Sequence, residues 1–459
     1  MSNDIEDRNY DVLIVGGGPS GSACGYWLAD AGWDVCVIER KHFPREKTCG
    51  DGLTPRAVRQ LEDMGLGPAL AGKHHRYDGL RAMAGGRTLE MGWPDHPDYP
   101  SYGYVVTRSD LDQMVAARAA EAGATVWQGT EATEPIIEAG GRVKGAIVRT
   151  KATANQAGAN EAGANEAGAN EAGANEAGAN EARTLRAVRA NYVVVADGAN
   201  SRFGRALGAA REREWPMGLA IRGYHRSPRS SEPWIESHLD LRDAEGTALP
   251  GYGWIFPLGD GRVNVGVGLL STSAPKRATG RTTNTSKLME AFVAGAPASW
   301  GLSPETSCGP PTGGKLPMGL AVGPRVGPTH LMVGDAGGSI NPFNGEGIAY
   351  AYETGRMAAF AVGEALASGQ AGALAGYERR LEDNYGLYYK VARAFVRLIG
   401  HPELMATLVG TSMYSRTLME WVLRIMANLL RSDELGPAEA AYRAVAAIAR
   451  LAPQRLNAA

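Results

Sequence analysis

The fold is decided near the N-terminus, where residues 10–29 read YDVLIVGGGPSGSACGYWLA. The apolar, β-branched residues 10–15 predict a strand, the glycines predict a tight turn, and the residues that follow have helical spacing. In this G-x-G-x-x-G pattern Gly16 makes the turn, Gly18 lets the backbone approach a pyrophosphate, and Gly21 lets helix and strand pack closely. The stretch therefore predicts a dinucleotide-binding strand, turn and helix.

A second strand is predicted at residues 34–38 (DVCVI), and it ends in Glu39. A carboxylate at this place accepts hydrogen bonds from an adenosine ribose and repels a 2′-phosphate, which favours FAD or NAD over NADP. The helix N-terminus offers free N–H groups to the phosphates. The expected nucleotide contacts are Gly16, Gly17, Gly18, Pro19, Ser20, Gly21, Glu39 and Arg40.

Two later segments favour FAD over NAD. Residues 329–333 (THLMV) predict a buried strand, followed by GDAGG and NPFNGEGI and a helix over 348–366. An aspartate and a glycine-rich helix entry suit a ribityl chain and a flavin, and the expected contacts are Asp335, Gly345, Gly347 and Ile348. Residues 192–202 (YVVVADGANSR) add Asp197 as a contact, or form only a strand-to-helix turn.

Taken in their order along the chain, the three motifs resemble the para-hydroxybenzoate-hydroxylase group of flavoproteins. Within that group, residues 43–54 (FPREKTCGDGLT) and 249–257 (LPGYGWIFP) are similar to the K-x-C-G and Y-x-W-x-F-P signatures of the geranylgeranyl reductase family. Leu258 stands where some members carry lysine, so no role for such a lysine is carried over. The repeat at 155–182 also departs from the family pattern.

The resemblance implies an α/β fold (α+β overall), with a Rossmann-like FAD domain, an antiparallel β substrate domain and a helical C-terminal region. The expected FAD-binding segments are 8–82, 105–154, 183–214 and 325–375. The substrate domain is expected at 83–104 and 215–324, and the helical region at 376–459.

The resemblance also implies FAD-dependent reduction of a carbon–carbon double bond in the isoprenoid tail of a prenyl lipid. Menaquinone, reduced to dihydromenaquinone, is the leading substrate, and a geranylgeranyl lipid or diphosphate is an alternative. An aromatic hydroxylase or halogenase would use the same FAD motifs, but the halogenase motif W-x-W-x-I-P is missing from the sequence. A non-catalytic, FAD-stabilised lipid carrier is a third alternative.

Alkene reduction needs a proton donor, because an isolated, electron-rich double bond does not accept hydride unaided. Cys49 is the candidate donor, or the residue that positions it, since its glycine-rich loop is expected beside the flavin. Gly50, Asp51 and Gly52 are expected to contact the flavin through the same loop. The alternative for Cys49 is a small buried residue, the role expected for Cys24 and Cys36.

Two further features fit this site. Tyr252, Trp254 and Phe256 alternate, so on a strand they share one face and form a wall of a lipid channel, unless they serve only sheet packing. Arg108, just before a predicted helix, corresponds to the family's flavin-contacting arginine. A capping or surface charge is its alternative.

A membrane-surface contact is expected from residues 387–431. Six basic residues outnumber two acids there, and apolar residues recur at helical spacing, as in a basic amphipathic surface that meets anionic lipid. The basic residues are Lys390, Arg393, Arg397, Arg416, Arg424 and Arg431, the acids are Glu403 and Glu420, and the apolar residues are Leu418, Trp421, Val422, Ile425 and Leu429.

Composition supports a globular protein of 459 residues, with 61 glycines and a net charge of −2. Residues 155–182 repeat the pentapeptide NEAGA, predict a disordered insert and carry five of the glutamates, so the rest has a net charge of +3. This balance excludes a role in coating nucleic acid. The histidines and cysteines have no metal-ligand spacing, so no metal is expected.

The expected location is cytoplasmic, on the inner face of the cell membrane. The first residues lack a basic segment followed by an apolar run, and no window has the ~18 apolar residues of a membrane span. One dinucleotide-binding pattern is present and no second one for NAD(P)H, so the electron donor is unknown.

Overall fold

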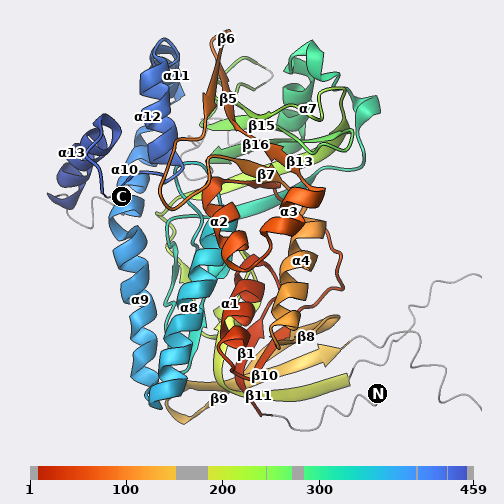
Figure 1. Cartoon of the computed structure of the whole chain (residues 1–459), viewed down its shortest axis with the longest axis vertical. Helices are drawn as coiled ribbons and strands as arrows, with labels where there is room; N and C mark the ends of the chain where they lie inside the picture. The colour runs from red at the N-terminus through yellow and green to blue at the C-terminus, as the bar shows by residue number, and fades with distance from the viewer. Residues whose placement is uncertain are drawn as a thin grey trace, which may run out of the picture.

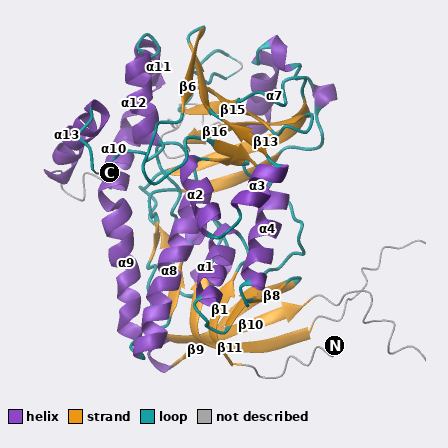
Figure 2. Ribbon diagram, viewed as in Figure 1, coloured by secondary structure: helices purple, strands orange, loops and turns teal. Residues whose placement is uncertain are grey.

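The computed structural model describes residues 9–150, 184–243, 245–270, 284–399, 402–431 and 433–451. The pentapeptide repeat, predicted as a disordered insert, lies outside the described residues. Two large β-sheets lie one beyond the other along the long axis, with α1, α4 and α8 beside the first and further helices along one flank (Figures 1 and 2).

The first sheet confirms the strands predicted around the glycine turn. Its order is β8-β2-β1-β11-β10-β9, and β19 pairs with β11. Strands β8, β2, β1, β11 and β19 are parallel, whereas β9 and β10 extend the sheet in antiparallel fashion. The bounds are Asn9–Val15 (β1), Val35–Ile38 (β2), Thr125–Trp127 (β8), Thr130–Glu138 (β9), Arg142–Thr150 (β10), Thr184–Val195 (β11) and His330–Met332 (β19).

Strand β1 is buried on both faces, which explains its uninterrupted apolar sequence. Val12 and Ile14 belong to the core that contains α1 and α8, whereas Leu13 and Val15 pack with β10 residues on the other face. Cys24 and Cys36 are fully buried in these two cores, as predicted.

Helices cover one face of this sheet (Figure 2). α1 (Pro19–Asp30) begins directly after the glycine turn and packs between α4 (Arg108–Glu121) and α8 (Ile348–Ser368). The backbones of α1 and α8 touch where a Cβ on Gly355 would lie 2.4 Å from the Ser20 carbonyl oxygen. The other elements of this part are α2 (Pro55–Asp63), α3 (Gly67–Lys73), α6 (Arg202–Ala206) and the 3-10 turns Ala139–Gly141 and Gly334–Gly337.

The second sheet has the order β17-β13-β16-β15-β14-β5-β6. It is antiparallel, as predicted, except that β14 and β5 are parallel. The boundary expected at residue 83 falls inside β5, so the chain enters this sheet earlier. The bounds are Gly79–Ala84 (β5), Arg87–Gly92 (β6), Met217–Arg226 (β13), Trp234–His238 (β14), Gly251–Pro257 (β15), Arg262–Leu270 (β16) and Thr312–Pro317 (β17).

Smaller elements lie between the two large sheets and along the helices (Figure 1). A three-stranded sheet has the order β3-β7-β4, and β12 pairs with β18. Helix α7 (Thr285–Gly295) packs against β13 and β16. The bounds are Gly52–Leu53 (β3), His75–Tyr77 (β4), Gly103–Val105 (β7), Ala210–Arg211 (β12), Val322–Gly323 (β18), and for 3-10 turns Ala298–Trp300, Pro304–Thr306 and Ala371–Leu374.

The C-terminal region is helical, and the mixed α/β fold class is confirmed. A π-helical turn, Glu382–Gly386, joins α9 to α10, and the chain then folds back through α11 and α12 (Figure 1). Within the described ranges, no helix is both long and apolar enough to cross a bilayer. The bounds are Ala375–Leu381 (α9), Leu387–Ile399 (α10), Pro402–Ser412 (α11), Arg416–Met426 (α12) and Pro437–Leu451 (α13).

Candidate functional site

The glycine turn leaves the start of α1 open to a ligand. Gly16 has a φ of 109°, and a Cβ there would lie 2.3 Å from the Ala196 carbonyl oxygen. A Cβ on Gly21 would lie 1.9 Å from the Gly16 carbonyl oxygen. By contrast, a Cβ on Gly18 would meet only Arg45, at 3.8 Å. Pro19 starts the helix, no side chain caps it and its first turn carries no acid, so its N–H groups suit a phosphate.

A chain of ion pairs runs from Glu39 into the interior. Glu39 Oε2 accepts a hydrogen bond from the Gly17 N–H at 3.2 Å and pairs with Arg45 at 3.1 Å. Arg45 also pairs with Asp112 at 2.9 Å, and Arg108 donates two hydrogen bonds of 2.8 Å to the same carboxylate. Glu39, predicted to face the ribose, is thus held rigidly from both sides.

Arg40, predicted as a nucleotide contact, has an exposed side chain just after β2. Arg45 instead reaches Glu39, and sequence reasoning did not single it out. Asp112 stands four residues after Arg108 on the same helix, a spacing that could have indicated their pairing.

The loop that carries Cys49 is tied down by hydrogen bonds. Cys49 Sγ accepts from the Asp51 N–H at 3.3 Å, and its carbonyl accepts from Arg222 at 3.1 Å and Asn264 at 2.9 Å. Burial raises the pKa of the Cys49 thiol, while the positive charge of Arg108 acts in the opposite direction. The sulfur is therefore a neutral thiol at neutral pH, next to a cation that would stabilise its anion.

Asp51 faces the protein interior. It is fully buried at a φ of 65°, and its carboxylate accepts from Tyr224 at 2.6 Å, Asn264 at 2.8 Å and the Arg108 N–H at 3.2 Å. Burial raises its pKa to about 6, although the hydrogen bonds from Tyr224 and Asn264 and the charges of Arg222 and Arg108 act against the rise. Asp51 thus joins the Cys49 loop to β13, β16 and the start of α4.

The Cys49 loop and the aromatic strand lie against each other. A Cβ on Gly50 would lie 3.2 Å from the Phe256 ring, and one on Gly52 would lie 3.1 Å from it. The three rings of Tyr252, Trp254 and Phe256 follow one another along one face, with centroids 5.8 and 6.2 Å apart. The two signatures, which are far apart in the sequence, therefore form one wall.

The three rings differ in exposure. Trp254 is 5% exposed and donates to Asn264 at 2.9 Å, whereas Tyr252 and Phe256 are partly exposed. Tyr252 donates to the Asn344 carbonyl at 2.7 Å, which ties the wall to the loop before α8. Asn264, a polar residue inside an apolar strand, was a signal in the sequence that the prediction missed.

The loops that carry Asp335 and Asp197 complete the site. Burial raises the pKa of Asp335, and the charges of Lys47 and Arg108 oppose the rise. A Cβ on Gly347 would lie 3.6 Å from Asp335 Oδ1, and α8 begins at Ile348 without a side-chain cap. Asp197 accepts from the Phe203 N–H at 3.1 Å through Oδ2, while its buried Oδ1 has no hydrogen-bond partner among the described residues.

These features fit FAD. Two helices, α1 and α8, present uncapped N-termini, and the cations Arg45, Lys47 and Arg108 lie near the same loops, as a diphosphate requires. Since the buried Asp197 Oδ1 has no hydrogen-bond partner in the described part of the chain, it is an acceptor available to a ligand hydroxyl. No cluster of metal-ligating side chains occurs in the described part of the chain.

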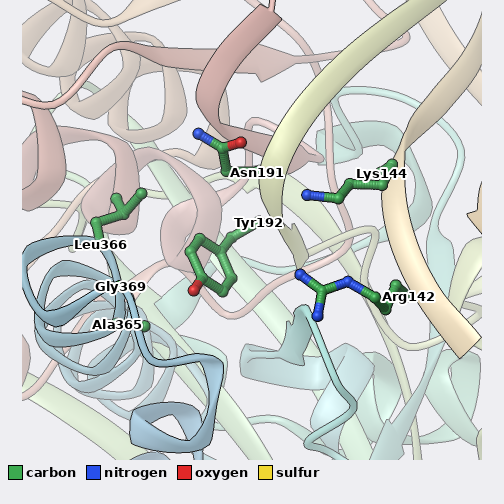
Figure 3. Close-up of a pocket in the computed structure, with 7 residues that line it drawn as sticks. All are labelled: Arg142, Lys144, Asn191, Tyr192, Ala365, Leu366 and Gly369. Atoms are coloured by element: carbon green, nitrogen blue, oxygen red, sulfur yellow. The ribbon is translucent and has the colours of Figure 1, made fainter. Parts of the chain in front are cut away.

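A separate pocket lies between the end of α8 and strands β10 and β11 (Figure 3). Figure 3 shows Arg142, Lys144, Asn191 and Tyr192 facing the α8 residues Ala365 and Leu366 and the following Gly369. None of these residues belongs to the loops described above, so the pocket is not part of the candidate site.

The fold and the site define an FAD-binding oxidoreductase. Residues 9–220 match the FAD binding domain family. The chain is 37% identical over 448 residues to a menaquinone reductase of Mycolicibacterium smegmatis, covering 97% of this chain and 98% of that protein. The chain belongs to the geranylgeranyl reductase family of flavoproteins, as its signatures predicted.

Two further similarities are more distant. A digeranylgeranylglycerophospholipid reductase of Methanopyrus kandleri is 29% identical over 406 residues, covering 86% of this chain and 91% of that protein. The crystal structure of a geranylgeranyl bacteriochlorophyll reductase-like protein of Thermoplasma acidophilum has a TM-score of 0.71 at 22% identity, covering 95% of this chain and 99% of that one. The latter similarity concerns the fold alone.

Proposed function

We propose that this protein is an FAD-dependent reductase that saturates a carbon–carbon double bond in the isoprenoid tail of a prenyl lipid, with menaquinone as the first candidate. The observation that carries the proposal is the packing of the Cys49 loop against the ring of Phe256. This packing joins a thiol, an apolar wall and the cofactor loops. The menaquinone reductase names of the full-length relatives support the choice of substrate.

The proposed cofactor contacts are those expected from the sequence, except that Arg45 takes the place of Arg40, whose side chain is exposed. Gly16 to Gly21, Glu39 and Arg45 would hold the adenosine and diphosphate. The loops at 49–52, 197, 335 and 345–348 and the Arg108 side chain would contact the flavin. When bound and reduced, FAD supplies a hydride.

The protein residues have to bind the tail, exclude water and bring a proton to the alkene. Tyr252, Trp254 and Phe256 offer an apolar surface along which a tail can lie. Cys49 acts beside this surface, either as the proton donor or as the residue that positions the donor. Its neutral thiol fits both roles, since Arg108 would stabilise the thiolate left by proton transfer.

The proposed function is tested by a single turnover without oxygen. The bound flavin is reduced with dithionite, excess reductant is removed, and menaquinone or a geranylgeranyl lipid is added. Because a quinone head also accepts two electrons, the product is treated with ferricyanide before mass analysis, so that only tail hydrogens remain. Two added hydrogens in the tail support the proposal. An added oxygen after admission of air indicates a hydroxylase, and an unchanged lipid indicates a carrier.

The role of Cys49 is tested with Cys49→Ala. We expect normal flavin content, because the cofactor loops are held by other residues, and a slower reoxidation of the flavin by the prenyl lipid. A variant that binds FAD and saturates the lipid at the wild-type rate would remove Cys49 from the mechanism.

We also propose contact with a membrane surface, but through apolar side chains and not through the basic surface expected from the sequence. Arg393 is turned inward, donating to the Gly319 carbonyl at 2.9 Å and stacking on Trp215 at 4.1 Å. Three other arginines pair with acids. Arg416 pairs with Glu420 inside the predicted segment, whereas Arg424 pairs with Glu439, and Arg431 with Asp433 and Glu434, beyond its end. Leu429, predicted on the apolar surface, is buried.

The α11–α12 hairpin instead offers apolar side chains to a lipid surface. Leu408, Tyr414 and Leu418 are 39%, 73% and 38% exposed. Arg87, from the neighbouring β5–β6 hairpin, stacks on Tyr414 at 3.6 Å (Figure 1). We infer that this tip dips into the headgroup region at the inner face of the membrane, chiefly through its apolar residues.

A further inference from the structure

Glu346 is a partly buried acid in the loop before α8, and the reaction outlined above does not use it. Thr54 Oγ1 donates a hydrogen bond to Glu346 Oε1, so this carboxyl joins the Cys49 loop region to the loop before α8. Its other oxygen, Oε2, is buried and has no hydrogen-bond partner among the described residues. The backbone of Glu346 is fixed as well, since its N–H donates to Asn344 Oδ1 at 2.9 Å. The carboxyl is thus positioned, with one oxygen left free.

The loop that carries Glu346 lies beside the aromatic wall. Tyr252 donates to the Asn344 carbonyl at 2.7 Å, and a Cβ on Gly345 would lie 4.0 Å from Tyr252 Oη. Burial, followed by the charges of Glu346 and Cys49, raises the pKa of Tyr252 to about 12. The ring of Tyr252 is therefore within electrostatic range of both Glu346 and Cys49.

The surroundings favour the protonated form of Glu346. Burial raises its pKa to about 7, and Glu353 raises it too, whereas Thr54, Arg56 and Asn344 lower it. Arg56 is already paired with Glu353 at 2.8 Å, and Glu346 forms no ion pair within the described residues. The other ionisable groups that interact with it are neutral phenols from several elements: Tyr77, Tyr252, Tyr350 and Tyr388.

We propose that Glu346 is the acid that supplies the proton for the alkene reduction, and that Cys49 is a positioning residue. The proposal rests on the proposed function, which provides the reduced cofactor as hydride source. The O–H bond of Glu346 breaks as a C–H bond forms at one alkene carbon, and the other carbon takes the hydride. The resulting carboxylate is held by Thr54 and regains its proton from solvent.

The chemistry favours a carboxyl over the thiol for this step. A general acid is most effective when its pKa lies near the working pH, because it is then both protonated and acidic. Glu346 meets this condition, whereas burial makes the Cys49 thiol a weaker acid than usual.

The activity test measures single-turnover reoxidation of the reduced holoenzyme by menaquinone across a pH series. In the wild type, the rate should fall as pH rises through about 7, because the acid loses its proton and can no longer donate it. Glu346→Gln should slow the step by about 10²–10⁴-fold and remove this pH dependence. Thr54→Val keeps the acid but removes a hydrogen bond that lowers its pKa, so the fall should move to higher pH. Cys49→Ala should keep the fall near neutral pH.

A second readout does not depend on turnover. Infrared difference spectra of the oxidised holoenzyme should show a protonated carboxyl band that titrates near neutral pH, is lost in Glu346→Gln and remains in Cys49→Ala. Wild-type rate and pH profile in Glu346→Gln, with normal flavin content, would overturn the inference, as would a pH dependence lost only in Cys49→Ala. If instead the wild type saturates no prenyl lipid, the proposed function fails, while the titration still reports on Glu346.

Discussion

Asp51 should give the protein a measurable dependence of stability on pH. Its pKa is raised from 3.8 to about 6 in the folded protein. A shift of about 2 units corresponds to about 3 kcal/mol. Because the folded pKa lies above the unfolded value, this stabilising contribution is present in full below about pH 4, is lost as pH rises through about 6, and is absent above that.

The assay compares wild type with Asp51→Asn by urea unfolding over this pH range at equal FAD concentration. Asparagine tolerates the left-handed backbone and does not titrate. The free energy of unfolding of Asp51→Asn, relative to that of wild type, should therefore increase by about 3 kcal/mol as pH rises. The offset at low pH reports the lost hydrogen bonds, about 1–3 kcal/mol.

Tyr224→Phe provides a matched control for Asp51. The hydrogen bond from Tyr224 lowers the pKa of Asp51, so its removal should extend the loss of stability to higher pH than in wild type. If the free energies of unfolding of wild type and Asp51→Asn changed in parallel with pH, Asp51 would have an ordinary pKa in the folded protein, and the prediction would be wrong.

Four further predictions concern the cofactor loops and the hairpin. Gly21→Ala places a Cβ 1.9 Å from the Gly16 carbonyl oxygen, so the purified protein should contain little flavin, and a normal flavin-to-protein ratio would contradict this. Gly50→Ala presses on Phe256 at 3.2 Å and should cost about 1 kcal/mol in thermal unfolding, a cost that Phe256→Ala should relieve in the double variant. Arg45→Met removes a partner of both Glu39 and Asp112 and should weaken FAD binding at least about tenfold in a flavin fluorescence titration, whereas an unchanged Kd would separate Arg45 from the cofactor. Tyr414→Ser with Leu418→Ser should reduce flotation with lipid vesicles without changing flavin content, and wild-type flotation would exclude the hairpin.

The sequence predicted those parts of the site that depend on local patterns. The glycine turn, the strands on either side of it and the shared face of Tyr252, Trp254 and Phe256 follow from spacing along the chain. The contact of Glu39 with Arg45 and the parallel pairing of β14 with β5 depend on segments brought together by folding, and no local period encodes them.

Other features were missed because a local pattern was read without its partners. In the sequence, the arginines near the C-terminus resemble a free basic surface. In the structure, acids beyond Arg431 form ion pairs with Arg424 and Arg431. Glu346 stands between two glycines, and no local pattern in the sequence distinguishes it. Only the structure shows its buried Oε2 and its hydrogen bond with Thr54.

The central claim is that reducing equivalents from the flavin are delivered to a prenyl tail. The most direct measurement is one anaerobic turnover of the reduced holoenzyme with menaquinone, followed by ferricyanide treatment and fragmentation of the lipid. One tail double bond should be saturated for each flavin reoxidised, with both new hydrogens in a tail fragment. Flavin reoxidation with a tail that returns to its starting mass would show that only the quinone head was reduced, and would contradict the claim.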